Sequence, residues 1–499
     1  MKNTKKIMMA LLPVAAALTL ASCSSDDDQI STPQSVNTIP YSVTVSESGT
    51  RAAFADGTYT GLVFAAGDKL YINNADGTVY GTLTMQSGSG TSSATFSGEL
   101  SYSGTAPTAE TALTATLLSA DNEVVQITNH KAAPQYGGIC ANLAEAVSKY
   151  SYLMGTSTFG AATFALSQGT AFLNISMTLN DGESGNKAVT VKNNYSSIAS
   201  GTVSGTGNVS FLVPVAAGTM LSNALVWVDG WKPSSTFGNT MTDAIGAKVY
   251  NIAKTVDKAA VPTDVNWVDL GIVVDGKKIL FADRNVGATN GATKESWYGS
   301  YFQWAAITPF TSSVDPTWGT CPYCADTEGT KFTKYMPSDM VSNWVGEGSP
   351  DNKLVLDPED NSVQAQWGKS VDYPTKEEWA ALCAAISTEN YTSEWKENYQ
   401  PEGSSAISGL NGYVITWSGT PAEGCGTTLF LPAAGQWNDK GLGHVGENGS
   451  YWSSSLSENK LAYSWSLYFR SNIYDNYFRN YEVGRFLGRS LRAVKRVAQ

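Results

Sequence analysis

The stretch KLYINNADGTVYGTLTM, residues 69–85, contains two alternating segments on either side of a turn. Leu70 and Ile72 alternate with more polar neighbours, and the same period of two continues from residue 79 to residue 85. The pair Asp76-Gly77 between the segments is typical of tight hairpin turns. The stretch therefore predicts a β-hairpin with one buried face.

The same period recurs on both sides of this hairpin. Alternating runs occupy residues 41–46, 94–100, 112–118, 171–179, 188–192, 209–215 and 224–228, whereas only residues 141–150 have a helical spacing. Residues 41–257 are therefore expected to be an all-β, sandwich-like region in two halves, about 41–145 and 150–257.

Composition supports a mostly β fold and marks a second region. Charged residues make up only 15% of the 499 residues and Gly is abundant (47), which is typical of β-rich extracellular proteins. Tryptophan is absent before Trp227 and most of it follows residue 266, which indicates a separate domain there. The net charge of −12 gives no footprint for nucleic acid. A local basic patch is expected near the end, from Arg485, Arg489, Arg492, Lys495 and Arg496.

The first 22 residues have the pattern of a secretory signal peptide. Lysines at positions 2, 5 and 6 precede an apolar run over residues 7–21, which is too short for a membrane span of roughly 20 apolar residues. The sequence Leu-Ala-Ser-Cys at 20–23 resembles a bacterial lipobox, which implies that Cys23 carries a lipid anchor. The alternative is an ordinary signal peptide followed by an unrelated cysteine.

Residues 23–40 are expected to form a flexible tether, because they are rich in Ser, Asp, Thr, Gln and Pro. The run Ser-Ser-Asp-Asp-Asp at 24–28 resembles the surface-export signal of Bacteroidetes lipoproteins. That resemblance implies a lipid-anchored protein of the outer membrane, facing the exterior. The same residues also suit a solvated tether without any signal.

Four segments of the β region, residues 64–72, 94–100, 152–157 and 246–252, resemble consecutive strands of fimbrillin-like proteins. Residues 166–169 depart from that pattern, since relatives often have histidine there. The family implies subunits that are cut after an arginine, lose their leading strand and accept a strand from a neighbour. Arg51 follows the first predicted strand and is the expected cutting site. Alternatively, it is an ordinary exposed arginine.

Residues 265–499 resemble the Fibrobacter succinogenes major paralogous domain, for which an α+β, C-type-lectin-like fold is implied. The resemblance is carried by residues 267–271, 279–288, 298–304, 374–379, 429–435, 449–455 and 488–494. Thr375 and Glu378 have the spacing of a capping box at the start of a helix. A lectin-like fold does not by itself imply sugar binding.

Cys321-Pro322-Tyr323-Cys324 resembles a redox motif outside its usual context. Pro316, Gly319 and Gly329 around it predict a loop, so a structural disulfide or two loop thiols are favoured over redox catalysis. A zinc site would need Cys383 and Cys425 as further ligands, but a helical core position favours burial of Cys383.

Catalysis is not expected, nor is a cofactor or a metal. The only histidines, His130 and His444, accompany no nucleophile. The tripeptide 437–439, Trp-Asn-Asp, is similar to the calcium-binding tripeptide of C-type lectins, but it lacks its partner motif and is interpreted as a surface loop. Asp357, Glu359 and Asp360 are interpreted as solvated charges of a loop rather than as hydrolase carboxylates.

The residues 474–481 mix aromatic, amide and charged side chains without alternation, which predicts a recognition loop. Tyr474, Tyr477, Arg479 and Tyr481 are the candidate ligand-binding residues. The sequence thus predicts a surface lipoprotein in adhesion or a fimbria-associated component, which binds a glycan or protein through its C-terminal domain. The alternative is a stand-alone binding lipoprotein unrelated to fimbriae.

Overall fold

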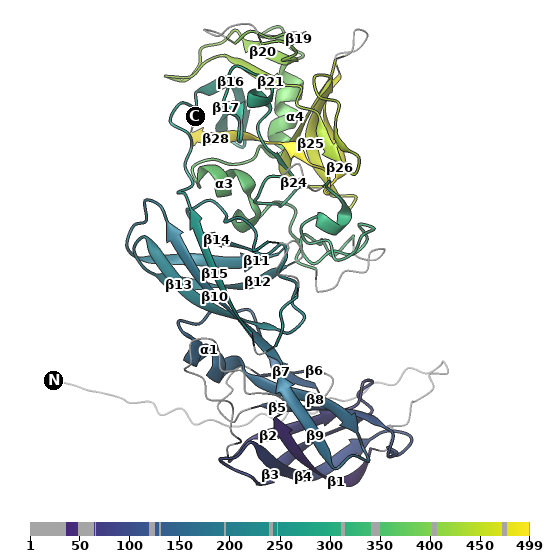
Figure 1. Ribbon diagram of the computed structural model, residues 1–499. Coiled ribbons are helices and arrows are strands. Elements are labelled where there is room, and N and C mark those ends of the chain that lie inside the picture. The colour runs from purple at the N-terminus through teal and green to yellow at the C-terminus, as the bar shows by residue number, and fades with distance from the viewer. Residues whose placement is uncertain are drawn as a thin grey trace, which may run out of the picture.

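The computed structural model describes residues 36–47, 64, 66–118, 125–128, 131–193, 196–238, 243–246, 248–310, 315–340, 350–401, 407–471 and 477–498. Its regular structure is mostly β, as the sequence predicts. Three units follow one another along the molecule in chain order (Figure 1). Among the described residues, no helix has the length and apolar character that crossing a membrane requires.

The first unit, called the barrel unit, is a closed barrel of strand order β1-β4-β3-β2-β5-β8-β9. The predicted hairpin is confirmed, with Leu70 opposite Leu83 and Gly77 at a φ of 74°, which glycine adopts without strain. A separate hairpin pairs β6 (Val125–Thr128) with β7 (Lys131–Pro134). The barrel strands are β1 (Asn37–Glu47), β2 (Lys69–Asn73), β3 (Val79–Ser87), β4 (Ser93–Tyr102), β5 (Ala112–Leu118), β8 (Tyr152–Thr158) and β9 (Thr163–Gln168).

Two boundaries differ from the sequence prediction. β8 pairs with β5 and with β9, so the barrel extends to Gln168 and the predicted division of the β region at 145–150 is wrong. Strands that complete a barrel join partners far away in the sequence, and alternation carries no information about such pairing. β1 also begins at Asn37, inside the predicted tether.

The second unit, called the sandwich unit, has two three-stranded sheets with a shared apolar core. One sheet has the order β13-β10-β15, with β10 and β15 parallel, and the other has the order β12-β11-β14. The strands are β10 (Thr170–Leu179), β11 (Asn186–Lys192), β12 (Ser197–Ser204), β13 (Asn208–Ala216), β14 (Leu225–Val228) and β15 (Val249–Val256).

The helix predicted at residues 141–150 is α1 (Leu143–Tyr150). The side chain of Asn142 caps its first turn by accepting a hydrogen bond from the backbone N–H of Glu145. Ala146, Val147 and Tyr150 pack against Phe172 and Leu212 of the sandwich unit. The helix therefore packs on the sandwich unit immediately before the chain enters β8 of the barrel unit.

The third unit, called the C-terminal unit, contains several small sheets, with the orders β16-β17-β28, β18-β27-β24-β25-β26, β19-β20-β21 and β22-β23. Its helices are α2 (Glu295–Tyr298), α3 (Ser362–Trp367) and α4 (Lys376–Ala385), with 3-10 turns η1 (Trp318–Thr320) and η3 (Pro358–Asp360). The strands are β16 (Trp267–Val274), β17 (Lys277–Asn285), β18 (Tyr301–Phe302), β19 (Tyr391–Lys396), β20 (Gly412–Trp417), β21 (Thr428–Pro432), β22 (Gln436–Asn438), β23 (Gly441–Gly443), β24 (Asn448–Leu456), β25 (Tyr463–Arg470), β26 (Tyr477–Gly484), β27 (Arg489–Ser490) and β28 (Arg492–Ala498). The lectin-like architecture stays a prediction.

The predicted capping box of α4 is confirmed. The Thr375 side chain accepts a hydrogen bond from the backbone N–H of Glu378, and the Glu378 carboxylate accepts one from the backbone N–H of Thr375. Trp379 and Leu382 then face the core of the unit and are fully buried. The cap thus fixes where the helix starts and which face it buries.

Candidate functional sites

β1 closes the barrel unit and is the first candidate site. It runs antiparallel to β4 over residues 37–46, whereas β9 pairs with it in parallel only over residues 44–47. Tyr41, Val43 and Val45 point into the core and are almost fully buried. β1 is therefore paired along its length with β4, but on both sides only over its last residues, and it contributes three apolar side chains to the core.

The predicted anchor and cutting site flank this strand but lie outside the described residues. Cys23 precedes β1 in the sequence, and Arg51 comes four positions after its last residue, Glu47. The lipidation of Cys23 and the processing at Arg51 therefore stay predictions.

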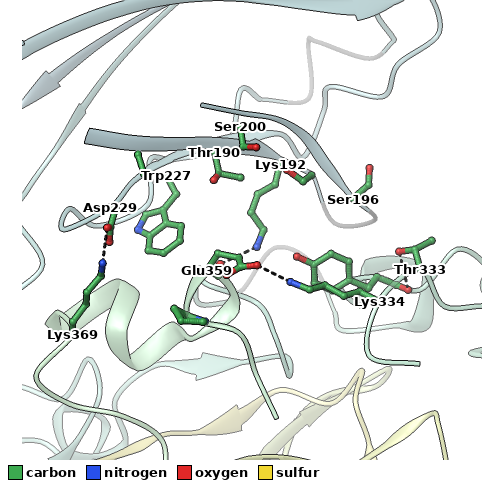
Figure 2. Close-up of a pocket in the computed structure, with 14 residues that line it drawn as sticks. Thr190, Lys192, Ser196, Ser200, Trp227, Asp229, Thr333, Lys334, Glu359 and Lys369 are labelled. Carbon is green, nitrogen blue, oxygen red and sulfur yellow. Dashed lines mark hydrogen bonds and ion pairs between the residues drawn. The ribbon is translucent and has the colours of Figure 1, made fainter. Parts of the chain in front are cut away.

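A second candidate site is the joint between the sandwich unit and the C-terminal unit. Leu225 and Trp227 of β14 pack against Ile307 and Ala365 of the C-terminal unit. At its rim, the ammonium of Lys369 lies 2.6 Å from the carboxylate of Asp229 (Figure 2). The joint combines an apolar contact with charge pairs.

The centre of the joint is Asp360, whose side chain is fully buried. It accepts hydrogen bonds from the hydroxyls of Tyr323 at 2.5 Å and Tyr335 at 2.6 Å. Lys192, at the end of β11, reaches it from the sandwich unit at 2.6 Å, and Lys334 pairs with it at 2.7 Å. We call these five residues the Asp360 cluster.

The contacts within the Asp360 cluster determine which of its side chains are charged. Burial alone would raise the pKa of Asp360, but the ammonium groups of Lys192 and Lys334 outweigh it and lower the pKa to about 2. Burial opposes the charge of Lys334 as well, yet its acidic neighbours raise its pKa. Burial beside Asp360 raises the pKa of Tyr323 and Tyr335, which therefore stay protonated donors. The cluster is charged, paired and saturated with hydrogen bonds.

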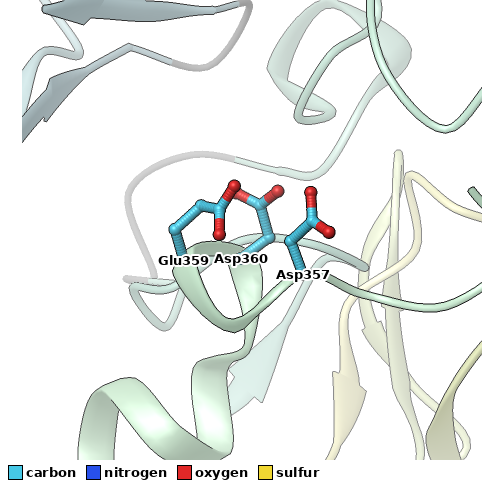
Figure 3. A group of neighbouring side chains, drawn as sticks. All are labelled: Asp357, Glu359 and Asp360. Atoms are coloured by element: carbon cyan, nitrogen blue, oxygen red, sulfur yellow. The ribbon is translucent and has the colours of Figure 1, made fainter. Parts of the chain in front are cut away.

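Asp357, Glu359 and Asp360 are close enough to suggest a metal site (Figure 3). The ammonium of Lys334 lies 2.6, 2.9 and 2.7 Å from their respective carboxylate oxygens. Lys192 also pairs with Asp360, and Lys353 with Asp357, so three ammonium groups of the protein already balance these three carboxylates. The interpretation of Asp360 as a solvated charge is wrong, because Lys192, 168 residues away in the sequence, folds onto it.

The Cys321–Cys324 motif lies in a loop after η1, as predicted. Both cysteines are free thiols and fully buried. Burial raises the pKa of both, that of Cys324 to about 11, so the reactive thiolate form is disfavoured. Cys383 is partly buried against the α4 core, and burial raises its pKa to about 12. Among the described residues, no cysteine belongs to a close group of metal ligands.

The predicted recognition loop is in part an edge strand. Over residues 477–484 the chain forms β26, which pairs with β25, whereas Tyr474 lies outside the described residues. The sequence of β26 does not alternate between apolar and polar residues, because the polar residue Asn480 faces inward. Its amide donates a hydrogen bond to the carbonyl of Lys376 at 2.6 Å. Arg479 and Tyr481 point outward, with the guanidinium 5.3 Å from the ring centre, and Tyr481 is 41% exposed.

The basic patch expected near the end does not exist on the surface. Arg485, Arg489 and Arg492 are each only 1% exposed. Arg492 donates to the carbonyls of Ala282 and Phe430 at 2.9 and 3.0 Å. Arg489 donates to the side chains of Ser466 and Gln436 at 2.6 and 2.9 Å. The sequence carries no signal for such buried roles.

The tripeptide at 437–439 is also not a plain loop. Trp437 and Asn438 belong to β22, which forms a hairpin with β23. The ring of Trp437 packs edge-on against Tyr301 at 6.5 Å. Trp437 is thus part of a local apolar contact, and no metal-ligand group forms around it among the described residues.

No family model matches the sequence, and no curated protein does. Solved structures that resemble this chain include the fimbrial anchor protein Mfa2 of Porphyromonas gingivalis, at 10% identity and a TM-score of 0.23, over 41% of this chain and 80% of that one. The tip fimbrial protein Mfa3 of the same organism matches at 9% identity and a TM-score of 0.19, over 39% and 78%. A fimbrial assembly protein of Parabacteroides distasonis matches at 9% identity and a TM-score of 0.22, over 50% and 96%. Matches at this level establish no function for the present chain.

Proposed function

We propose that this chain is a surface-exposed lipoprotein of the outer membrane that acts in adhesion as a fimbria-associated subunit. Cys23 would hold it to the membrane through acyl chains until β1 is removed by a cut at Arg51. The observation that carries the proposal is the position of β1, which closes the barrel and ends four residues before that arginine.

Removal of β1 would leave a site that another strand can fill. Loss of Tyr41, Val43 and Val45 from the core would cost roughly 5–9 kcal/mol, at about 1.5–3 kcal/mol for each buried side chain. That is comparable to the whole stability of a typical domain, about 5–15 kcal/mol. The emptied barrel would therefore require a replacement strand, which a neighbouring subunit supplies by strand addition.

We place this subunit at an end of a fimbria, with its C-terminal unit as the binding head. β28, the last described strand, pairs with β17 inside its own unit and is not free for donation. Arg479 and Tyr481 on β26 offer a guanidinium and an exposed ring, which suit a glycan or protein ligand.

The mature N-terminus tests the proposal. Protein should be extracted from the surface of the native cells, separated into membrane-bound and fimbria-assembled fractions, and examined by mass spectrometry. Lipid-modified Cys23 is expected on the membrane fraction and Ala52 on the assembled fraction. An Arg51→Ala variant should retain the lipid and be lost from the assembled fraction, and Arg51→Lys separates an arginine-specific protease from a broader one.

Lipid-modified Cys23 in every fraction would contradict strand removal. The same result would favour the stand-alone lipoprotein, in which β1 is a permanent part of the barrel.

A further inference from the structure

A cavity of about 580 Å³ lies at the joint between the sandwich unit and the C-terminal unit. This volume is within the range of small-molecule binding sites, about 300–1,000 Å³. Figure 2 shows its two walls, the outer face of the β12-β11-β14 sheet and the segments of the C-terminal unit that carry Lys334, Glu359 and Lys369. The site is therefore incomplete in either unit alone.

Hydroxyl groups dominate one wall. Thr190 of β11 and Ser197 and Ser200 of β12 line the cavity from the sheet, and Thr333 faces them from the C-terminal unit. A hydroxyl both donates and accepts hydrogen bonds, so this wall matches a ligand that itself carries many hydroxyls.

The charges of the cavity are paired with one another. Lys369 pairs with Asp229 at 2.6 Å, and Lys334 pairs with Glu359 at 2.9 Å. Lys192 is held by Asp360 at 2.6 Å. Each lysine that lines the cavity is thus paired with a carboxylate and does not neutralise an anionic ligand. The cavity therefore favours a neutral ligand, which can accept hydrogen bonds from the lysines and donate hydrogen bonds to the carboxylates.

The cavity also has an apolar side. Trp227 lines it, and its position is fixed because the indole N–H donates to the carbonyl of Trp231 at 3.0 Å. Aromatic rings give a rigid apolar surface against which the C–H face of a sugar ring can pack.

We propose that this cavity binds a neutral saccharide through the hydroxyls of β11 and β12, the paired charges and Trp227. The inference rests on the proposed adhesive function and assigns a ligand class to it. The cavity is a binding site separate from Arg479 and Tyr481 on β26.

The test uses the full chain in detergent on an array of neutral, sialylated and sulfated glycans, followed by titration calorimetry with a neutral glycan that binds. Ser200→Trp fills the cavity from an exposed strand position, and Lys369→Met alters its rim. Each variant is expected to weaken binding on the order of tenfold or more. Near-UV circular dichroism shows whether each variant is folded.

Thr202→Trp, at an exposed position of β12 that does not line the cavity, is the matched control and should leave the affinity unchanged. Tyr481→Ala tests β26 as the alternative binding site. Binding of anionic glycans alone, binding of no glycan, or an affinity that changes with Tyr481→Ala but not with folded Ser200→Trp and Lys369→Met would each overturn the proposal. None of these results depends on the N-terminus, so failure of the saccharide site and failure of strand removal are distinguished.

Discussion

Asp360 is the residue whose loss should affect stability most, because two lysines and two tyrosines converge on it. In Asp360→Asn the amide no longer balances the ammonium groups of Lys192 and Lys334. Breaking a buried ion pair typically costs about 3–5 kcal/mol. We expect a loss of that size in urea denaturation. Glu359→Gln, at a carboxylate that is 45% exposed, is the control and should cost about 1 kcal/mol or less.

The wild type and Asp360→Asn also allow a test of the pH dependence of stability. Because the folded pKa of Asp360 is lowered to about 2, its stabilising effect is fully present above the unfolded pKa of about 3.9 and is lost as the pH falls through 2. The difference in unfolding free energy between wild type and Asp360→Asn should therefore be constant from pH 7 to pH 5 and shrink between pH 4 and pH 2. A difference that is already lost at pH 5 would contradict the charged cluster.

The cysteines of the 321–324 loop give a second residue-scale prediction. Burial raises the pKa of Cys321 and Cys324, so the thiolates needed for alkylation are scarce at pH 8. Both should resist iodoacetamide in the folded protein and react fully in guanidinium without reductant, as peptide mass spectrometry would show. Labelling of the folded protein would restore the redox interpretation, and failure to label the unfolded protein would reveal a disulfide.

At the scale of elements, α4 shows what a short signal can fix. Thr375→Ala removes the side-chain acceptor for the backbone N–H of Glu378, which should cost about 1 kcal/mol. Thr375→Ser keeps an oxygen at that position and should cost a few tenths at most. Thermal unfolding of the two variants makes the comparison, and equal losses would mean that packing of the Thr375 methyl group matters more than the cap.

The sequence predicts those helices and strands whose formation depends on residues close together in the chain. The hairpin at residues 69–85 depends on Asp76-Gly77 and adjacent alternation, and α1 and α4 depend on caps within a few residues. Closure of the barrel was not predictable, since Thr44 pairs with Thr163 across the intervening sequence. The strand character of β26 was hidden by the inward-facing Asn480, whose partner carbonyl belongs to α4.

The candidate sites follow the same division. Arg51 and β1 could be placed next to each other from the sequence, because they are neighbours in it. The cavity and the Asp360 cluster could not, because Lys192 and Asp360 meet only after two units have folded and docked. The burial of arginines 485, 489 and 492 is not predictable, since a cluster of charges in the sequence carries no information about burial.

At the scale of the whole molecule, the joint should make the sandwich unit and the C-terminal unit energetically dependent on each other. A double-mutant cycle with Lys192→Met, Asp360→Asn and the double variant measures that dependence. Because the Lys192 side chain is 8% exposed and that of Asp360 is 0% exposed, their coupling should exceed about 1 kcal/mol in urea denaturation. A second cycle at Lys369 and Asp229 is the control. These side chains span the same joint at the same 2.6 Å but are 65% and 33% exposed, so their coupling should be about 1 kcal/mol or less. Weak coupling in both cycles would mean that the joint is solvated at its charge pairs. Strong coupling in the first cycle and weak coupling in the second would mean that the buried pair, and not the exposed pair, couples the two units.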